Sequence, residues 1–190
     1  MKLILASASP RRKELLTLAG YEYEVCPADI DETCPAELSP AETVRFLSEK
    51  KASAVSADHP DAAVLGADTV VALGSEILGK PKDRQDAVRM LTLLSGKTHT
   101  VYTGVAVAVN GQVKSFVSSC DVDFYELSKS EIRAYANSGE PMDKAGAYGI
   151  QGKGAVLVKA IHGDFYTVVG LPLALCARLL GEFGLHGYTI

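Results

Sequence analysis

The segment SASPRRK near the N-terminus combines hydroxyl and cationic side chains at the start of a predicted helix. Ser9 is expected to be the N-cap and Pro10 the first helical residue, which puts Arg11, Arg12 and Lys13 in the first turn. The helix dipole is positive at that end, so three cations there are unfavourable. A bound anion would relieve this conflict, because free helix N–H groups and Arg side chains form good phosphate sites. A phosphate site and a solvated basic turn account for the segment equally well.

Asp68 lies inside a long apolar segment, residues 62–73, which is predicted to be a buried strand. A carboxylate in such a place is costly unless it is paired, hydrogen-bonded or bound to a metal. Gly66 fits a position where another group comes close to the backbone. A structural Asp at the exit of the strand is the alternative, but the cost of burial favours a functional carboxylate.

Two further segments could contribute to a site. Asp29, Asp31 and Glu32 offer the oxygen ligands that a hard cation such as magnesium prefers, although a solvated acidic loop is the commoner explanation of such a run. Residues 143–154 contain four glycines, which suggests tight turns or close approach of the backbone to a ligand. An ordinary flexible loop explains the glycines equally well.

Composition narrows the class of protein. The chain has 190 residues, of which 47% are hydrophobic and 22% charged, which is typical of a globular domain with a full core. A net charge of -4 gives no support for binding a nucleic-acid polymer, and no apolar segment is long enough to cross a membrane. The four cysteines lack zinc-type spacing, so we expect reduced thiols in the cytoplasm.

Common nucleotide-binding and metal-binding motifs are missing from the sequence. Gly96-Lys97-Thr98 resembles the end of a P-loop, but Leu91 stands where that motif needs its first glycine. The histidines are scattered, so we expect packing or surface roles for each of them: His59, His99, His162 and His186.

Helices and strands alternate along the chain. Asn110-Gly111 is a strong signal for a hairpin between two long strands, so the sheet must be mixed. We therefore predict the α/β class, with a mixed and strongly curved sheet flanked by helices. Strands are expected at residues 3–6, 22–27, 62–73, 76–78, 98–109 and 112–126, and helices after the N-caps Ser9, Ser39, Asp83 and Ser128, followed by two short strands and a last helix at about 171–183.

Six segments resemble signature motifs of the Maf nucleotide pyrophosphatases. Each is weak alone, but together they span almost the whole chain in the expected order, which makes the resemblance specific. The one that begins at Asp143 is similar to the dTTP/UTP branch of the family, whereas the 7-methyl-GTP branch differs there. The segments are residues 5–16 (LASASPRRKELL), 66–69 (GADT), 79–81 (GKP), 95–99 (SGKTH), 143–152 (DKAGAYGIQG) and 169–172 (VGLP).

The resemblance implies a fold and an activity. It implies one domain over residues 1–190, bilobed with a central cleft and related to the inosine triphosphate pyrophosphatase fold. It further implies a homodimer and a divalent cation, Mg²⁺ or Mn²⁺. The implied reaction is hydrolysis of dTTP and UTP to the monophosphate and pyrophosphate, with a role in nucleotide house-cleaning or in arrest of cell division.

The resemblance also implies site residues. Asp68 matches the proton acceptor of the family, and Glu32 matches an acidic residue that helps to hold the metal; whether Asp68 is base, metal ligand or both stays open. Positions linked to substrate choice are Arg11, Thr69 and Gln151. Positions that hold phosphates are Ser7, Arg12, Lys51 and Lys80, and Lys50 adjoins Lys51 closely enough to make that match ambiguous.

Two alternatives remain for the function. A non-catalytic nucleotide-binding regulator would need the same cations, but binding alone does not call for carboxylates near a phosphate. Asp68 and Glu32 together with Lys80 therefore favour an enzyme. An enzyme of the same class that acts on 7-methyl-GTP or on modified nucleotides is the other alternative.

Overall fold

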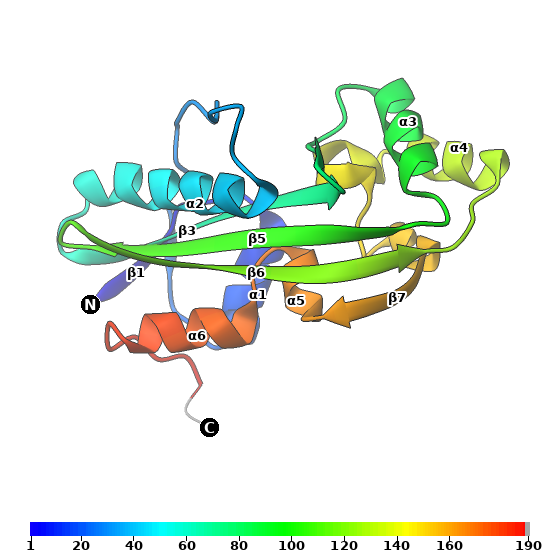
Figure 1. Cartoon of the computed structure of the whole chain (residues 1–190). Helices are drawn as coiled ribbons and strands as arrows, with labels where there is room; N and C mark the ends of the chain where they lie inside the picture. The colour runs from blue at the N-terminus through cyan, green and yellow to red at the C-terminus, as the bar shows by residue number, and fades with distance from the viewer. Residues whose placement is uncertain (189–190) are drawn as a thin grey trace. The chain divides into compact units, whose positions relative to one another are not determined.

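The computed structural model of the chain describes residues 1–188 and has helices around a β-sheet (Figure 1). Its strands are β1 (Lys2–Leu5), β2 (Glu24–Val25), β3 (Ala62–Leu73), β4 (Glu76–Leu78), β5 (Thr98–Val109), β6 (Gln112–Phe124) and β7 (Val158–Gly163). Its α-helices are α1 (Pro10–Leu18), α2 (Pro40–Ala57), α3 (Arg84–Leu94), α4 (Lys129–Asn137), α5 (Phe165–Val169) and α6 (Leu173–Gly181). Three short 3-10 helices are η1 (Glu140–Asp143), η2 (Ala145–Ala147) and η3 (Lys153–Leu157).

The described strands form one seven-stranded sheet in the order β2-β1-β3-β5-β6-β7, with β4 paired to β3. β1 pairs in parallel with both β2 and β3, whereas β3 with β4 and β6 with β7 are antiparallel. The predicted α/β class with a mixed sheet is therefore confirmed. The sheet is open and uncurled, because β2 and β7 end the strand order without pairing to each other, so the strong curvature that we expected is corrected.

The chain divides into two compact units, and the division falls within the long strands β3, β5 and β6. Unit 1 contains Met1–Asp68, Thr103–Ser118 and the segment from Gly170 onward. Unit 2 contains Thr69–Tyr102 and Ser119–Val169.

In unit 1, the backbone of α2 lies directly on the sheet. A Cβ atom at Gly66 of β3 would overlap the carbonyl oxygen of Ser48, and one at Gly104 of β5 would overlap that of Val44. The close approach that we predicted at Gly66 is thus the approach of a helix. The capping box that begins α2 is also as predicted, since Ser39 Oγ accepts from the N–H of Glu42 at 3.3 Å and the Glu42 carboxylate accepts from the N–H of Ser39 at 2.8 Å.

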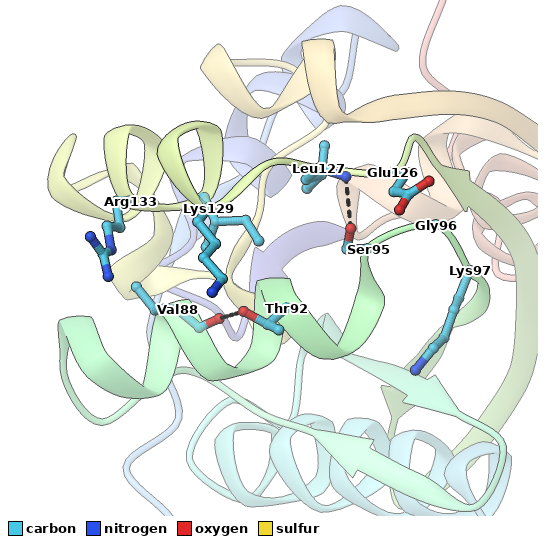
Figure 2. Close-up of a pocket in the computed structure, with 10 residues that line it drawn as sticks. Val88, Thr92, Ser95, Gly96, Lys97, Glu126, Leu127, Lys129 and Arg133 are labelled. Carbon is cyan, nitrogen blue, oxygen red and sulfur yellow. Dashed lines mark hydrogen bonds between the residues drawn. The ribbon is translucent and has the colours of Figure 1, made fainter.

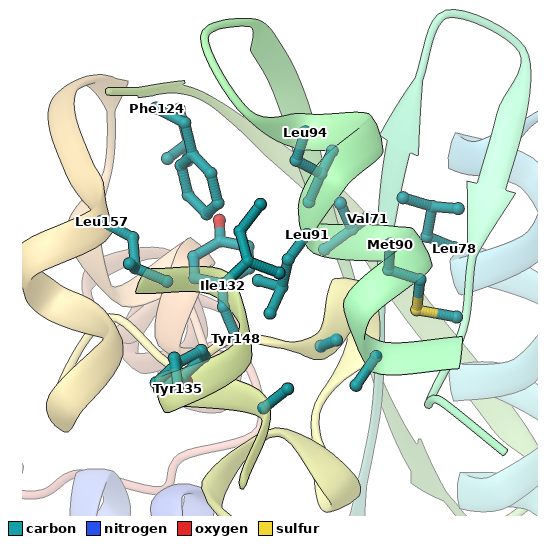
Figure 3. Close-up of a cluster of buried hydrophobic side chains, with 14 of the residues drawn as sticks. Val71, Leu78, Met90, Leu91, Leu94, Phe124, Ile132, Tyr135, Tyr148 and Leu157 are labelled. Atoms are coloured by element: carbon teal, nitrogen blue, oxygen red, sulfur yellow. The ribbon is translucent and has the colours of Figure 1, made fainter. Parts of the chain in front are cut away.

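In unit 2, α3 and α4 cover a hydrophobic cluster (Figure 3). Leu91 and Leu94 of α3 and Ile132 of α4 pack there with Phe124 and Tyr148. His99 is buried beside the two aromatic rings, and its Nε2 lies 2.8 Å from the Tyr148 hydroxyl oxygen. The packing role that we expected for this histidine is confirmed.

One expectation about the second half of the chain was wrong. We expected two short strands before the last helix, but the described residues form one there, β7. Residues 165–169 form helix α5, although their sequence FYTVV is rich in strand-forming residues. The Asp164 carboxylate accepts from the N–H of Thr167 at 2.8 Å and from its hydroxyl at 2.9 Å, and this cap starts a helical turn in spite of the local preference. The predicted glycine-rich loop is present at residues 148–152, between η2 and η3. None of the helices formed by residues 1–188 is both long and apolar enough to cross a membrane.

Candidate active site

Strand direction brings the segment after β1 next to residues 65–68 of β3, within unit 1. β1 and β3 run parallel with Leu5 opposite Leu65, and the N–H of Ala6 donates to the carbonyl oxygen of Leu65 at 2.8 Å. The residues that follow Leu5 and Leu65 therefore continue in the same direction, with Ser7 after the first and Asp68 after the second. Ligands in open α/β sheets commonly bind beyond the carboxyl ends of such parallel strands.

The turn before α1 is organised by the hydroxyl of Ser7. Helix α1 begins at Pro10 with Ser9 in the N-cap position, as predicted, but the Ser9 side chain makes no capping hydrogen bond. The N–H of Ser9 instead donates to Ser7 Oγ at 3.3 Å, and Nη1 of Arg12 donates to the same oxygen at 3.1 Å. Ser7 and Arg12, both predicted phosphate ligands, thus lie together.

Arg12 is half-buried, and its guanidinium is held at a second point. Its Nε donates to the carbonyl oxygen of Gly170 at 2.9 Å. Burial lowers the pKa of Arg12, the charge of Asp68 opposes that shift, and the neighbouring Arg11 adds to it. The charges of Arg12 and Asp68 are therefore close enough to stabilise each other.

Lys51 joins the two carboxylates that we predicted. Its Nζ donates to Asp68 Oδ1 at 2.7 Å and lies 2.9 Å from Glu32 Oε1. The side chains of Lys51 and Asp68 are only 10% and 12% exposed, whereas that of Glu32 is 58% exposed. Of the two adjacent lysines, Lys51 makes these contacts, whereas Lys50 donates to the backbone carbonyl of Asp31.

The acidic segment that contains Asp31 and Glu32 contributes Glu32 to the cluster around Lys51. The Asp31 carboxylate accepts from the hydroxyl of Thr33 at 2.6 Å and from its N–H at 2.9 Å, and these bonds lower the pKa of Asp31. Asp31 therefore stabilises its own loop. Of the predicted trio Asp29, Asp31 and Glu32, Glu32 is the member that contacts Lys51 among the described residues.

The donor set fits a magnesium-type cation in part. Within residues 1–188, no group of three or more His, Cys, Asp or Glu side chains is placed to hold a metal. Mg²⁺ is, however, commonly bound by one or two carboxylates together with phosphate oxygens of a substrate. Two carboxylates that share one ammonium group, as Glu32 and Asp68 do, satisfy that smaller requirement.

Of the other predicted residues, Arg11 and Thr69 directly adjoin Arg12 and Asp68 in the chain, whereas Lys80 and Gln151 do not. Arg11 is half-buried in the first turn of α1 in unit 1. Thr69 is half-buried in unit 2, and Lys80 and Gln151 are exposed there. The segments that carry Lys80 and Gln151 touch each other, since the N–H of Gly146 donates to the carbonyl oxygen of Gly79 at 3.0 Å.

Unit 2 also has a hollow of about 660 Å³ between α3 and α4 (Figure 2). Thr92 of α3 and Lys129 and Arg133 of α4 lie around it, and the Ser95 hydroxyl accepts from the N–H of Leu127 at 2.7 Å in its wall. None of the predicted site residues lines this hollow, so it is separate from the candidate active site.

Sequence reasoning missed one partner of the site in unit 1. The carbonyl oxygen of Gly170 fixes Arg12 across 158 residues of chain. The signal was present in the segment VGLP, which we quoted as a motif without giving any of its residues a role. A backbone acceptor cannot be recognised from residue type, because every residue has a carbonyl group.

The family model described as Maf-like protein matches residues 2–183 of the chain. The chain belongs to the Maf family. This Maf protein is 51% identical over 184 residues to the "dTTP/UTP pyrophosphatase" of Bacillus pumilus. The match covers 97% of each of the two chains. It is 54% identical over 182 residues to the protein of the same name from Bacillus cytotoxicus, covering 96% of this chain and 95% of that one.

A solved structure of a HAM1 protein from Coxiella burnetii has the same fold as this Maf protein. The TM-score is 0.54 at 16% sequence identity, with 96% of this chain and 99% of that chain covered. The likeness confirms the predicted relation to the inosine triphosphate pyrophosphatase fold, and at this identity it carries no further argument.

Proposed function

We propose that this Maf protein hydrolyses dTTP and UTP to the nucleoside monophosphate and pyrophosphate. The observation that carries the proposal is the cluster in unit 1, in which Lys51 contacts both Asp68 and Glu32. The charge of Asp68 also acts on the guanidinium of Arg12. The printed names of relatives that are 51% and 54% identical over nearly the full chain supply the substrates.

The cations would bind the triphosphate. Phosphoryl transfer depends mainly on positioning and on neutralising the charge that develops on phosphate oxygens. The guanidinium of Arg12 can form two parallel hydrogen bonds to a phosphate, and its position is already fixed by Ser7 and Gly170. Lys51 would supply a second charge, because a phosphate can compete with the two carboxylates for its ammonium group.

Asp68 is the residue that we propose as proton acceptor. Water attacks the α-phosphorus, the bond from that phosphorus to the bridging oxygen breaks, and pyrophosphate leaves with the β and γ phosphates. The proton of the attacking water passes to an Asp68 carboxylate oxygen. When bound, a magnesium or manganese ion held by Glu32 and Asp68 together with phosphate oxygens would neutralise charge and acidify the water.

Residues of unit 2 would select the base. Gln151 and Thr69 can donate and accept hydrogen bonds, as recognition of a pyrimidine edge requires. Lys80 would add charge for the phosphates, and Arg11 is retained as a further substrate-choice position. The homodimer, the cytoplasmic location, the single domain over residues 1–190 and the role in house-cleaning or division arrest remain predictions.

Pyrophosphate release from a panel of nucleoside triphosphates, with magnesium or manganese, tests the proposal. Asp68→Asn should lower the rate by about 10²–10⁴-fold, the usual contribution of a general base, while the protein still folds. Asp61→Asn is the matched control, because Asp61 is exposed in the same unit and should keep the full rate. A full-rate Asp68→Asn protein contradicts the assignment of the base.

The same panel separates the alternatives. Turnover of dTTP and UTP supports the proposed branch, whereas preference for 7-methyl-GTP supports the other one. Tight binding of nucleotides without turnover by the wild type identifies a regulator. Gln151→Ala should change the preference among bases, and an unchanged preference excludes a reading role for Gln151.

A further inference from the structure

The segment that carries Gln151 is tied to one carboxylate in unit 2. Oε2 of Glu140 accepts from the N–H of Lys153 at 2.9 Å, and Oε1 accepts from the N–H of Gly154 at 3.1 Å. Oε1 also accepts from the hydroxyl of Tyr135 at 2.9 Å. That hydroxyl oxygen in turn accepts from the N–H of Gly149 at 3.0 Å. The backbone is thus held on both sides of Gln151.

The glycines of this segment make room for the same anchor. A Cβ atom at Gly152 would lie 2.6 Å from both carboxylate oxygens of Glu140, well inside van der Waals contact. One at Gly154 would lie 2.6 Å from the hydroxyl oxygen of Tyr135, and one at Gly149 would lie 2.6 Å from Cε of Lys144. These three glycines therefore lie in close contact with Glu140, Tyr135 and Lys144.

Glu140 is charged in this setting. Its burial acts to raise the pKa, but the two backbone N–H groups, the Tyr135 hydroxyl and the charge of Lys144 together hold the pKa of Glu140 below its usual value. Burial raises the pKa of Tyr135, so its hydroxyl stays protonated and can donate to the carboxylate. Lys144 is itself fixed, because its Nζ donates to the carbonyl oxygen of Glu140 and to Asp143, at 2.7 Å each.

We propose that Glu140 is a positioning residue for substrate choice, acting through the backbone on either side of Gln151. Hydrogen bonds to an ionised acceptor are stronger than neutral ones, and three of them converge on this carboxylate. The exposed Gln151 side chain then projects from a backbone of fixed shape. The inference deepens the proposed function and rests on it, since Glu140 would affect substrate choice only through Gln151.

Amide hydrogen exchange, followed residue by residue by NMR, tests the anchor without any substrate. In Glu140→Gln, an NH₂ group replaces one carboxylate oxygen and the negative charge is lost. The NH₂ group then faces a backbone N–H that needs an acceptor. The amides of Lys153 and Gly154 should then exchange about tenfold to a hundredfold faster, the factor expected for loss of a hydrogen bond to a charged group. Glu126→Gln is the matched control, because the Glu126 carboxylate makes no hydrogen bond with another of the described residues.

Tyr135→Phe provides an independent route to the same result. It removes the hydroxyl that links Glu140 to the N–H of Gly149, so the Gly149 amide should exchange faster while the carboxylate stays in place. Trypsin gives a second readout, since cleavage after Lys153 requires the segment to open. Unchanged exchange and unchanged cleavage in both variants would overturn the proposal.

Base preference tests the step from anchor to substrate choice. The ratio of kcat/KM for dTTP to that for dCTP should fall in Glu140→Gln. In a Gln151→Ala background, adding Glu140→Gln should lower the ratio no further. Faster exchange with an unchanged ratio would overturn the role in substrate choice, and so would additive losses in the double variant.

Failure of the proposed function looks different from failure of this inference. If the wild type releases no pyrophosphate from any triphosphate, the proposed reaction fails. The same ratio is then taken from dissociation constants of dTTP and dCTP, and a ratio that Glu140→Gln leaves unchanged overturns the inference on its own.

Discussion

Protonation of His99 is expected to destabilise the protein as the pH falls. The ring is 2% exposed, and its Nδ1 has no hydrogen-bond partner among the described residues. Burial lowers the pKa of His99 from 6.5 to about 4, although the charges of Asp123 and Asp121 oppose the shift. The neutral imidazole is thus part of the core of unit 2, where it packs against Phe124 and Tyr148.

The sign and size of the effect follow from those two pKa values. Between pH 6.5 and pH 4 the unfolded chain binds a proton at His99 and the folded chain does not, so the free energy of unfolding falls as the pH is lowered through this window. At 1.36 kcal/mol per pKa unit, the gap corresponds to a loss of about 3 kcal/mol, complete near pH 4. That is a large part of the stability of an ordinary domain, about 5–15 kcal/mol.

Urea unfolding at several pH values measures this contribution. Carboxylates whose pKa values are lowered by folding, such as those of Asp31 and Glu42, also cost stability at low pH. The quantity to compare is therefore the difference between the wild type and His99→Gln at each pH. The advantage of the wild type at pH 7 should shrink by about 3 kcal/mol at pH 4. Val64→Ala, a core variant of unit 1 without a titrating group, should show a difference that is constant with pH. A His99→Gln difference that is equally constant refutes the reasoning.

Two further predictions concern the helices of unit 1. Gly66→Ala places a methyl group against the carbonyl oxygen of Ser48 in α2 and should lower the free energy of unfolding by about 3 kcal/mol or more. Gly79→Ala is the control, because the space around its Cβ is open, and it should lower the free energy of unfolding by less than about 0.5 kcal/mol. Similar midpoints of urea unfolding for the two variants would contradict the packing of α2. Ser39→Ala should cost about 0.5–2 kcal/mol because it removes a capping box, and Ser9→Ala much less because that side chain caps nothing. Equal losses by thermal unfolding would show that the two N-caps do not differ.

Much of the fold was predictable because its signals are local. The bounds of β3, β4 and β5 agree with the predicted ranges, since composition and turn residues determine where these strands end. The hairpin between β5 and β6 has Asn110 and Gly111 both at positive φ, 47° and 77°, as a type I′ turn requires. The capping boxes at Ser39 and Ser128 likewise depend on residues three positions apart.

The remaining features depend on contacts between distant segments. Helix α5 was not predicted, because its residue types favour a strand and the cap from Asp164 was overlooked. The choice between Lys50 and Lys51 could have been made from helical periodicity. Lys51 lies on the buried face of α2 with Val44, Ser48 and Val55.

The part played by Glu140 was out of reach of sequence reasoning. Its partners are two backbone N–H groups more than ten residues away and a tyrosine on α4. The spacing of the glycines hinted that something approached the backbone, but it could not say whether a ligand or a carboxylate did so.

The two places where α2 rests on the sheet without an intervening side chain have a consequence for how the site withstands mutation. At Gly66 and Gly104, main chain meets main chain, so the height of the helix above the strands is set by covalent geometry and atomic radii. Lys51 lies three residues after Ser48, and Asp68 lies two residues after Gly66, so both are close to this contact in the chain. Substitutions that enlarge or shrink core side chains elsewhere can therefore accumulate without changing the gap between ammonium and carboxylate. Glycine at both positions is therefore a condition for keeping the distance between ammonium and carboxylate.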